Sequence, residues 1–126
     1  KWSEPLGGLL ALLGALYEDD ICAVYVRGGL SDFQSVVAEQ FVYIPHDVVV
    51  PGVLTFGDLP DLAAAIAPRP LRLDNLVDGF NRLRSAGHVR SVYRPAVQSY
   101  KDADAADKLV IDDATHPASR WLLEQL

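Results

Sequence analysis

The sequence predicts an α/β domain of three layers, with a short parallel sheet of about three strands between helices. A chain of 126 residues, half of them apolar, is long enough for one domain with a buried core. Short runs of β-branched residues alternate with segments whose apolar residues recur at helical spacing. This alternation is typical of parallel strands joined by crossover helices, and residues 1–126 are therefore expected to form a single domain.

The first part of the chain predicts a helix, a strand and a second helix. Apolar residues surround the helix expected over 6–16, which indicates that it is buried. The run ICAVYV at 21–26 is typical of a strand that is covered on both faces. Ser31 and Gln34 have the spacing of a capping box, which predicts a short helix over 32–39.

The middle of the chain predicts an irregular segment followed by a helix and a strand. Prolines and glycines interrupt 41–58, which favours an ordered loop with a possible turn of helix. Asp58 is expected to cap a helix that has Pro60 in its first turn and that continues to Pro68. The segment 71–76 then predicts the second strand.

The last part predicts a helix, the third strand and a final helix. Apolar residues over 89–100 recur at helical offsets, and Pro95 is expected to distort that helix because it removes one backbone donor. A short strand is expected over 108–111 and a helix over 119–126. A single helix between the second and third strands makes them neighbours in the sheet.

Composition excludes several classes of partner and site. The formal charge of −6 argues against a nucleic-acid partner. Cys22 is the one cysteine, so the chain alone forms no disulfide, and the residue is interpreted as a buried thiol. The apolar run 6–17 is too short for a membrane span and has no signal-peptide pattern, which favours a cytoplasmic protein. His46 and His88 are expected to be solvated, so we expect neither metal nor cofactor.

Asp78 and His116 are the candidate catalytic residues. Asp78 follows the second predicted strand and His116 follows the third, so both belong to the carboxyl edge of the sheet, where functional groups of parallel sheets gather. A carboxylate that orients an imidazole is the supporting part of a nucleophilic triad. Two alternatives stay open: Asp78 as a turn residue that binds its own backbone, and His116 as the start of the last helix.

Four arginines follow Asp78 within a short stretch of sequence. They fit either a carboxylate-binding patch or the ordinary solvent-facing side of a helix, and the helix surface is favoured. These residues are Arg82, Arg84, Arg90 and Arg94.

Four stretches of this sequence resemble a known family. They read GGLLALLGALYEDDICAVYV, PGVLTFGDLPDLAAAIAPRPL, NLVDGFN and ATHPASRWLLEQL. Together they look like the carboxyl-terminal half of α/β-hydrolases of the acetyl xylan esterase and dienelactone hydrolase type. The resemblance implies a partial α/β-hydrolase fold, with Asp78 matching the acid of a Ser-His-Asp triad and His116 matching its histidine.

The segment 1–8 departs from that family. Such enzymes carry G-x-S-x-G on the turn before the helix that here begins near Leu6. Here the segment reads KWSEPLGG, and the family's nucleophile position falls near Pro5. Ser3 is the nearest hydroxyl and is out of frame, so it is either a displaced nucleophile or a helix cap or chain end, and the second interpretation is favoured.

Two functions from different classes follow. The first is an esterase-like hydrolase fragment or degenerate relative, inactive alone, that would act on a small ester only if another chain supplied the nucleophile. The second is a non-catalytic interaction module that dimerises. A three-stranded sheet cut from a larger one exposes an edge, and a second copy or a complementing chain is the expected partner.

Overall fold

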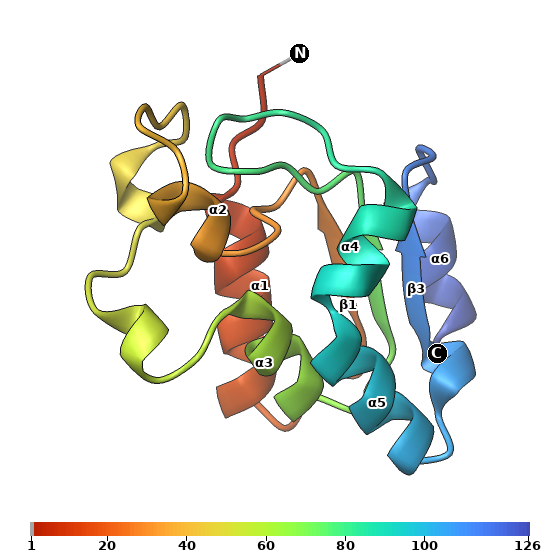
Figure 1. The fold of residues 1–126 in the computed structure, drawn as a ribbon. Helices are drawn as coiled ribbons and strands as arrows, with labels where there is room; N and C mark the ends of the chain where they lie inside the picture. Colours follow the sequence, from red (N-terminus) through yellow and green to blue (C-terminus); the bar gives the residue numbers. More distant parts are fainter. Residues whose placement is uncertain (1) are drawn as a thin grey trace.

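The computed structural model describes residues 2–126 and confirms an α/β fold with a three-stranded parallel sheet flanked by helices (Figure 1). Lys1, part of the segment compared with the nucleophile turn, lies outside the described residues. The strands are β1 (Val24–Arg27), β2 (Leu71–Asp74) and β3 (Leu109–Asp112). Their order in the sheet is β1-β2-β3, so β2 and β3 are neighbours as predicted.

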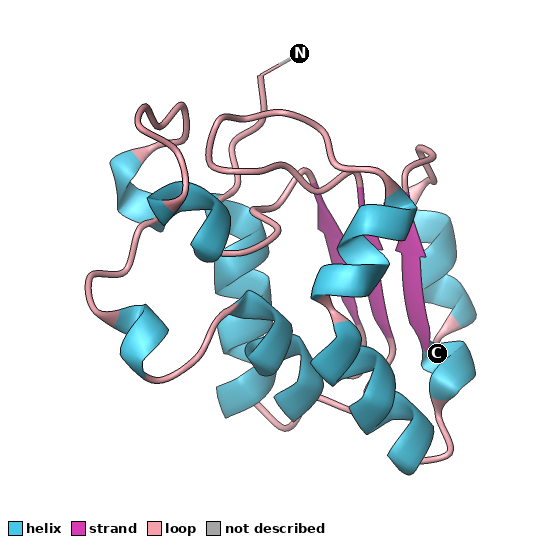
Figure 2. Ribbon diagram, in the orientation of Figure 1, coloured by secondary structure: helices cyan, strands magenta, loops and turns pink. Residues whose placement is uncertain are grey.

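Helices cover both faces of the sheet unequally. The helices α1, α3, α4 and α5 lie on one face, and α6 lies on the other (Figures 1 and 2). The helices are α1 (Leu6–Tyr17), α2 (Gln34–Val37), α3 (Leu59–Ala65), α4 (Ala86–Val92), α5 (Arg94–Asp102) and α6 (Ala118–Glu124). The described residues also form 3-10 turns at η1 (His46–Val48), η2 (Val53–Thr55) and η3 (Ala106–Lys108).

The main core lies between the sheet and the larger helical layer. Leu71 and Leu73 of the central strand are almost completely buried there. Tyr93 and Tyr100 are also fully buried, and each hydroxyl donates to a backbone carbonyl, that of Tyr93 to Ser31 at 2.7 Å. Burial raises the pKa of both tyrosines above the ordinary value, because the charged form loses its hydration.

The expectation that α1 is buried all round is wrong. Leu9 and Leu12 are buried, because α1 packs against β1, α3 and η1 on one side. Leu10 is 57% exposed and Tyr17 is 77% exposed on the other side.

The expected strand 21–26 is also corrected. The strand begins at Val24, and Cys22 before it is exposed rather than buried. Arg27 is exposed and Tyr25 only partly buried, so the face of β1 toward α6 is covered only in part. The reason is its position at the edge of the sheet, which an apolar run of sequence does not reveal.

The capping box predicted from Ser31 and Gln34 is absent, and α2 has only four residues. Asp32 takes over the role, because its carboxylate accepts from the Ser35 amide at 2.7 Å. Asp58 is confirmed as the cap of α3, with Asp61 completing a true capping box.

Asp58 also ties α2 to α3. Its carboxylate accepts from the amides of Phe33 at 2.6 Å and Gln34 at 3.1 Å, in addition to the Leu59 amide at 2.7 Å. One carboxylate therefore satisfies the amino ends of two helices.

The helix predicted over 89–100 is two helices, α4 and α5, that meet at Tyr93. Pro95 lies in the first turn of α5, where a missing backbone donor costs no helical hydrogen bond. The break thus precedes the proline, instead of the proline distorting a continuous helix.

Among the described residues, no single helix has the length and apolar character needed to cross a membrane. His46–Thr55 and Leu59–Ala65 meet that criterion only as a pair, by length and composition, with a bend of 79° between them.

Two adjacent glycines of α1 test how closely that helix approaches the sheet. A Cβ at Gly8 would lie 2.7 Å from Val26 Cγ1 and 3.2 Å from Gly29 Cα, whereas a Cβ at Gly7 meets nothing within 4 Å. We expect Gly8→Ala to lower the free energy of unfolding by about 1–3 kcal/mol, the cost of an overpacked contact. Gly7→Ala, the matched control, should raise it by about 0.5 kcal/mol through helix propensity. Urea denaturation measures both, and equal stabilities would contradict the close contact.

Candidate functional site at the carboxyl edge of the sheet

The carboxyl ends of the three parallel strands point to the same side of the molecule (Figure 2). The pairing of β1 and β2 continues past their ends through a bridge between Leu30 and Val77. Asp78 therefore starts its loop directly above the sheet. His116 lies in the loop that follows β3, before α6 begins at Ala118.

Asp78 is fully buried, and its own loop satisfies its carboxylate. Oδ1 accepts from the amides of Phe80 and Arg82, each at 2.9 Å. Oδ2 accepts from Nε of Arg82 at 2.9 Å and forms an ion pair with Nη2 of Arg82, also at 2.9 Å. Nε of Arg84 lies 3.6 Å from the same oxygen. The carboxylate is thus surrounded by donors of residues 80–84.

The pKa of Asp78 is lower than its ordinary value. Burial alone raises the pKa of a carboxyl group, but the hydrogen bonds from the backbone and guanidinium of Arg82 and from the Phe80 amide outweigh it. Asp78 is therefore charged at neutral pH, which suits an acid that supports a histidine and equally suits one that holds a loop.

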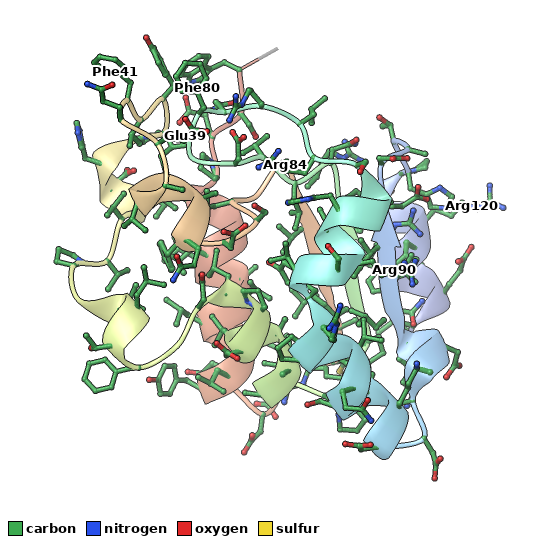
Figure 3. The ribbon with its side chains drawn as sticks, viewed as in Figure 1. Glu39, Phe41, Phe80, Arg84, Arg90 and Arg120 are labelled. Carbon is green, nitrogen blue, oxygen red and sulfur yellow. The ribbon has the colours of Figure 1, made fainter. Side chains whose placement is uncertain are left out.

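Arg82 extends this arrangement to the surface. Its guanidinium also pairs with Glu39 and lies over the ring of Phe80, 5.0 Å from the ring centre. Figure 3 shows Glu39 and Phe80 near each other at the same end of the molecule as the carboxyl ends of the strands. Arg84 lies in the same loop. Arg82 thus binds a carboxylate of its own chain and Arg84 lies within ion-pair distance of it, and neither is part of a helix surface, in contrast to the favoured expectation.

Two further residues hold the loop of Asp78 in position. Gly79 donates its amide to Ser35 Oγ at 3.0 Å and touches α2 so closely that a Cβ there would lie 2.7 Å from Val36 Cα. Asn81 has a positive φ of 61°, a conformation that asparagine tolerates better than most residues. The loop is consequently fixed at both of these positions.

Ser3 reaches this loop through Asn81. The amide of Ser3 donates to Asn81 Oδ1 at 3.0 Å, and Asn81 Nδ2 donates to the Ser3 carbonyl at 2.9 Å. The Ser3 hydroxyl donates to the carbonyl of Gly28. Ser3 makes no capping bond to α1, whose N-cap is Pro5, so the favoured interpretation as a cap is wrong.

His116 is held by its backbone. Its carbonyl accepts from the Tyr25 hydroxyl at 2.9 Å and from the guanidinium of Arg27, both on the face of the sheet that α6 covers. Within residues 2–126, no hydrogen bond reaches its ring, and neither a hydrogen bond nor an ion pair joins it to Asp78 or Ser3. The structure thus brings Ser3 and Asp78 to one loop and leaves His116 on separate contacts. The catalytic roles of the three residues stay predictions.

A buried polar network lies under α6, and sequence reasoning missed it. Arg72 pairs with Asp74 at 2.9 Å and with Asp112 at 3.1 Å, and the Tyr25 hydroxyl donates to Asp74 at 2.7 Å. Burial and the bond to Asp74 raise the pKa of Tyr25. The alternation of LRLD in β2 was the available signal, because it places Arg72 and Asp74 on one face of the strand.

No group of three or more metal-binding side chains occurs in the described part of the chain. His46 and His88 are exposed, as predicted. Neither a family model, a curated protein nor a solved structure matches this chain. The comparisons thus leave the chain as a small α/β domain, and the esterase resemblance stays a hypothesis from sequence.

The buried charge of Asp78 predicts a pH-dependent stability. Asp78→Asn removes the anion that organises residues 80–84, and we expect a loss of about 2–3 kcal/mol in the free energy of unfolding at pH 7. Because the folded pKa is lowered, this contribution is complete above the ordinary pKa of about 4 and disappears as the pH falls through the folded value.

Chemical denaturation of both proteins between pH 7 and pH 2 checks this. The difference between them should be largest at neutral pH and should shrink below about pH 4. Asp47→Asn, at an exposed site, is the control. A difference that stays constant over the whole range would show that Asp78 does not act through its charge.

Proposed function

We propose that this chain is a fragment or degenerate relative of the esterase-like α/β-hydrolases and does not hydrolyse esters by itself. The support for kinship is the combination of sequence stretches with topology. Three parallel strands occur in consecutive order, Asp78 follows the second, and His116 follows the third. The proposed relatives place a triad acid and histidine at these two points.

The main support for the absence of activity is that the carboxylate of Asp78 already has hydrogen-bond partners within its own loop. A triad acid must accept a hydrogen bond from the ring of the histidine, so that the imidazole keeps the tautomer that can take a proton from the nucleophile. Here Arg82 and two backbone amides occupy both oxygens of Asp78. Arginine is always charged and binds a carboxylate through two nitrogens, so a neutral imidazole does not displace it readily.

The nucleophile side supports the same conclusion. The Ser3 hydroxyl donates to the carbonyl of Gly28, and no histidine of the described residues accepts a hydrogen bond from it. A serine nucleophile instead needs a histidine within hydrogen-bond reach. The sharp turn that would present a serine above the sheet is replaced by Pro5 and the first turn of α1.

The test is the hydrolysis of p-nitrophenyl acetate. The purified protein should release p-nitrophenol no faster than its His116→Ala variant, because among residues 2–126 no hydrogen bond joins that ring to Asp78 or Ser3. The His88→Ala variant controls for hydrolysis by an exposed imidazole. Turnover that His116→Ala abolishes, that His88→Ala retains and that a mock purification lacks would overturn the proposal.

A further inference from the structure

Within residues 2–126, the strand β1 pairs with a neighbouring strand on one side only. Its inward backbone groups are paired, since the amide of Val24 donates to Pro70 at 2.9 Å and that of Gly28 to Asp74 at 3.0 Å. Alternate residues of a strand direct their amides and carbonyls to opposite sides, so those of Tyr25 and Arg27 point to the open side. No other strand lies on that side within residues 2–126.

A groove between α1 and α6 lies beside the carboxyl end of this open edge. Near the carboxyl end of β1 the wall on one side is α1 and on the other α6. The residues there are Glu4, Gly7, Gly8, Tyr25, Arg27 and Ala118. A second, mainly apolar recess lies at the amino end of β1, and it is lined by Ile21, Cys22, Ala23, Leu122, Leu123 and Leu126.

The groove has room and exposed apolar surface. Gly7 leaves open space where any other residue would place a side chain, and Gly8 lets α1 lie against Val26 without filling the edge. Leu123 is 68% exposed and Leu126 is 91% exposed in the apolar recess. Unpaired backbone groups beside exposed apolar side chains are the features of a sheet edge that accepts a strand.

We propose that one extended segment of another polypeptide adds to the open side of β1 in this groove. A second copy of the chain would bring its own α1 and α6 to the same edge, and the sedimentation experiment below distinguishes it from such a segment.

The side chains that line the groove indicate which residue types the added segment should carry. Arg27 is exposed, and no carboxylate of the described residues lies within 4 Å of it, so it offers an unneutralised charge to an acidic side chain. Ala23 lies four positions before Arg27, in the apolar recess. The preferred segment therefore carries a carboxylate and a large apolar side chain four residues apart, on one face of an extended strand.

Two synthetic peptides test this chemistry in both strand directions: Thr-Leu-Thr-Val-Thr-Glu-Thr and Thr-Glu-Thr-Val-Thr-Leu-Thr. Fluorescence anisotropy of labelled peptides should show that one of them binds the full chain. The version with lysine in place of glutamate should bind about fivefold more weakly, the effect of one exposed charge pair. Backbone N-methylation should abolish binding at one set of alternate positions and leave it unchanged at the other, which only strand pairing produces.

Arg27→Glu should reverse the preference between the glutamate and lysine peptides, and Arg27→Ala should remove it. Circular dichroism verifies that both variants keep the fold.

The proposal is overturned if neither peptide binds, or if the preference is the same in all three proteins. It is also overturned if sedimentation shows a dimer that Arg27→Pro dissociates while Arg27→Ala does not, since a second copy then fills the groove. The inference rests on the open edge of β1 and on Arg27, which is not one of the three candidate catalytic residues, so esterase activity would leave it standing.

Discussion

The carboxyl edge of this domain depends on one buried charge, the carboxylate of Asp78. A fully buried anion requires donors, and the loop that supplies them is thereby fixed in shape. That shape brings Gly79 against α2 and Asn81 against the segment before α1. The segment before α1, the helix α2 and the loop after β2 are distant in sequence, and they meet at the loop whose shape Asp78 fixes.

The same charge separates two interpretations of one sequence motif. An aspartate after the second strand fits a triad acid and a loop anchor equally well, and the deciding residue is its partner. Arg82, four positions later, provides the partner from within the loop. His116 instead contributes its carbonyl to Tyr25 and Arg27 at the edge strand. These contacts support a structural role for the acid in the isolated chain.

The sequence predicted the features that depend on local patterns of residues. It did not predict the features that depend on tertiary contacts. Apolar periodicity and the capping aspartate at 58 located α3, and the alternation of elements correctly predicted parallel strands. The exposure of Cys22 was not predicted, because the residue precedes β1 instead of lying within a buried strand. Arg82 was interpreted as part of a helix surface, because its contact with Asp78 requires a loop conformation that no periodicity encodes. The position of His116 relative to Asp78 likewise depends on tertiary contacts.

The two faces of the sheet differ in how firmly their layers are attached. Under α6 the sheet presents Tyr25, Arg72 and Asp74, and Trp121 is the buried residue that α6 itself contributes. The hydrophobic effect stabilises this layer less than the opposite one, where leucines and tyrosines pack together. Amide hydrogens of α6 are therefore expected to exchange through local opening while the rest of the domain stays folded.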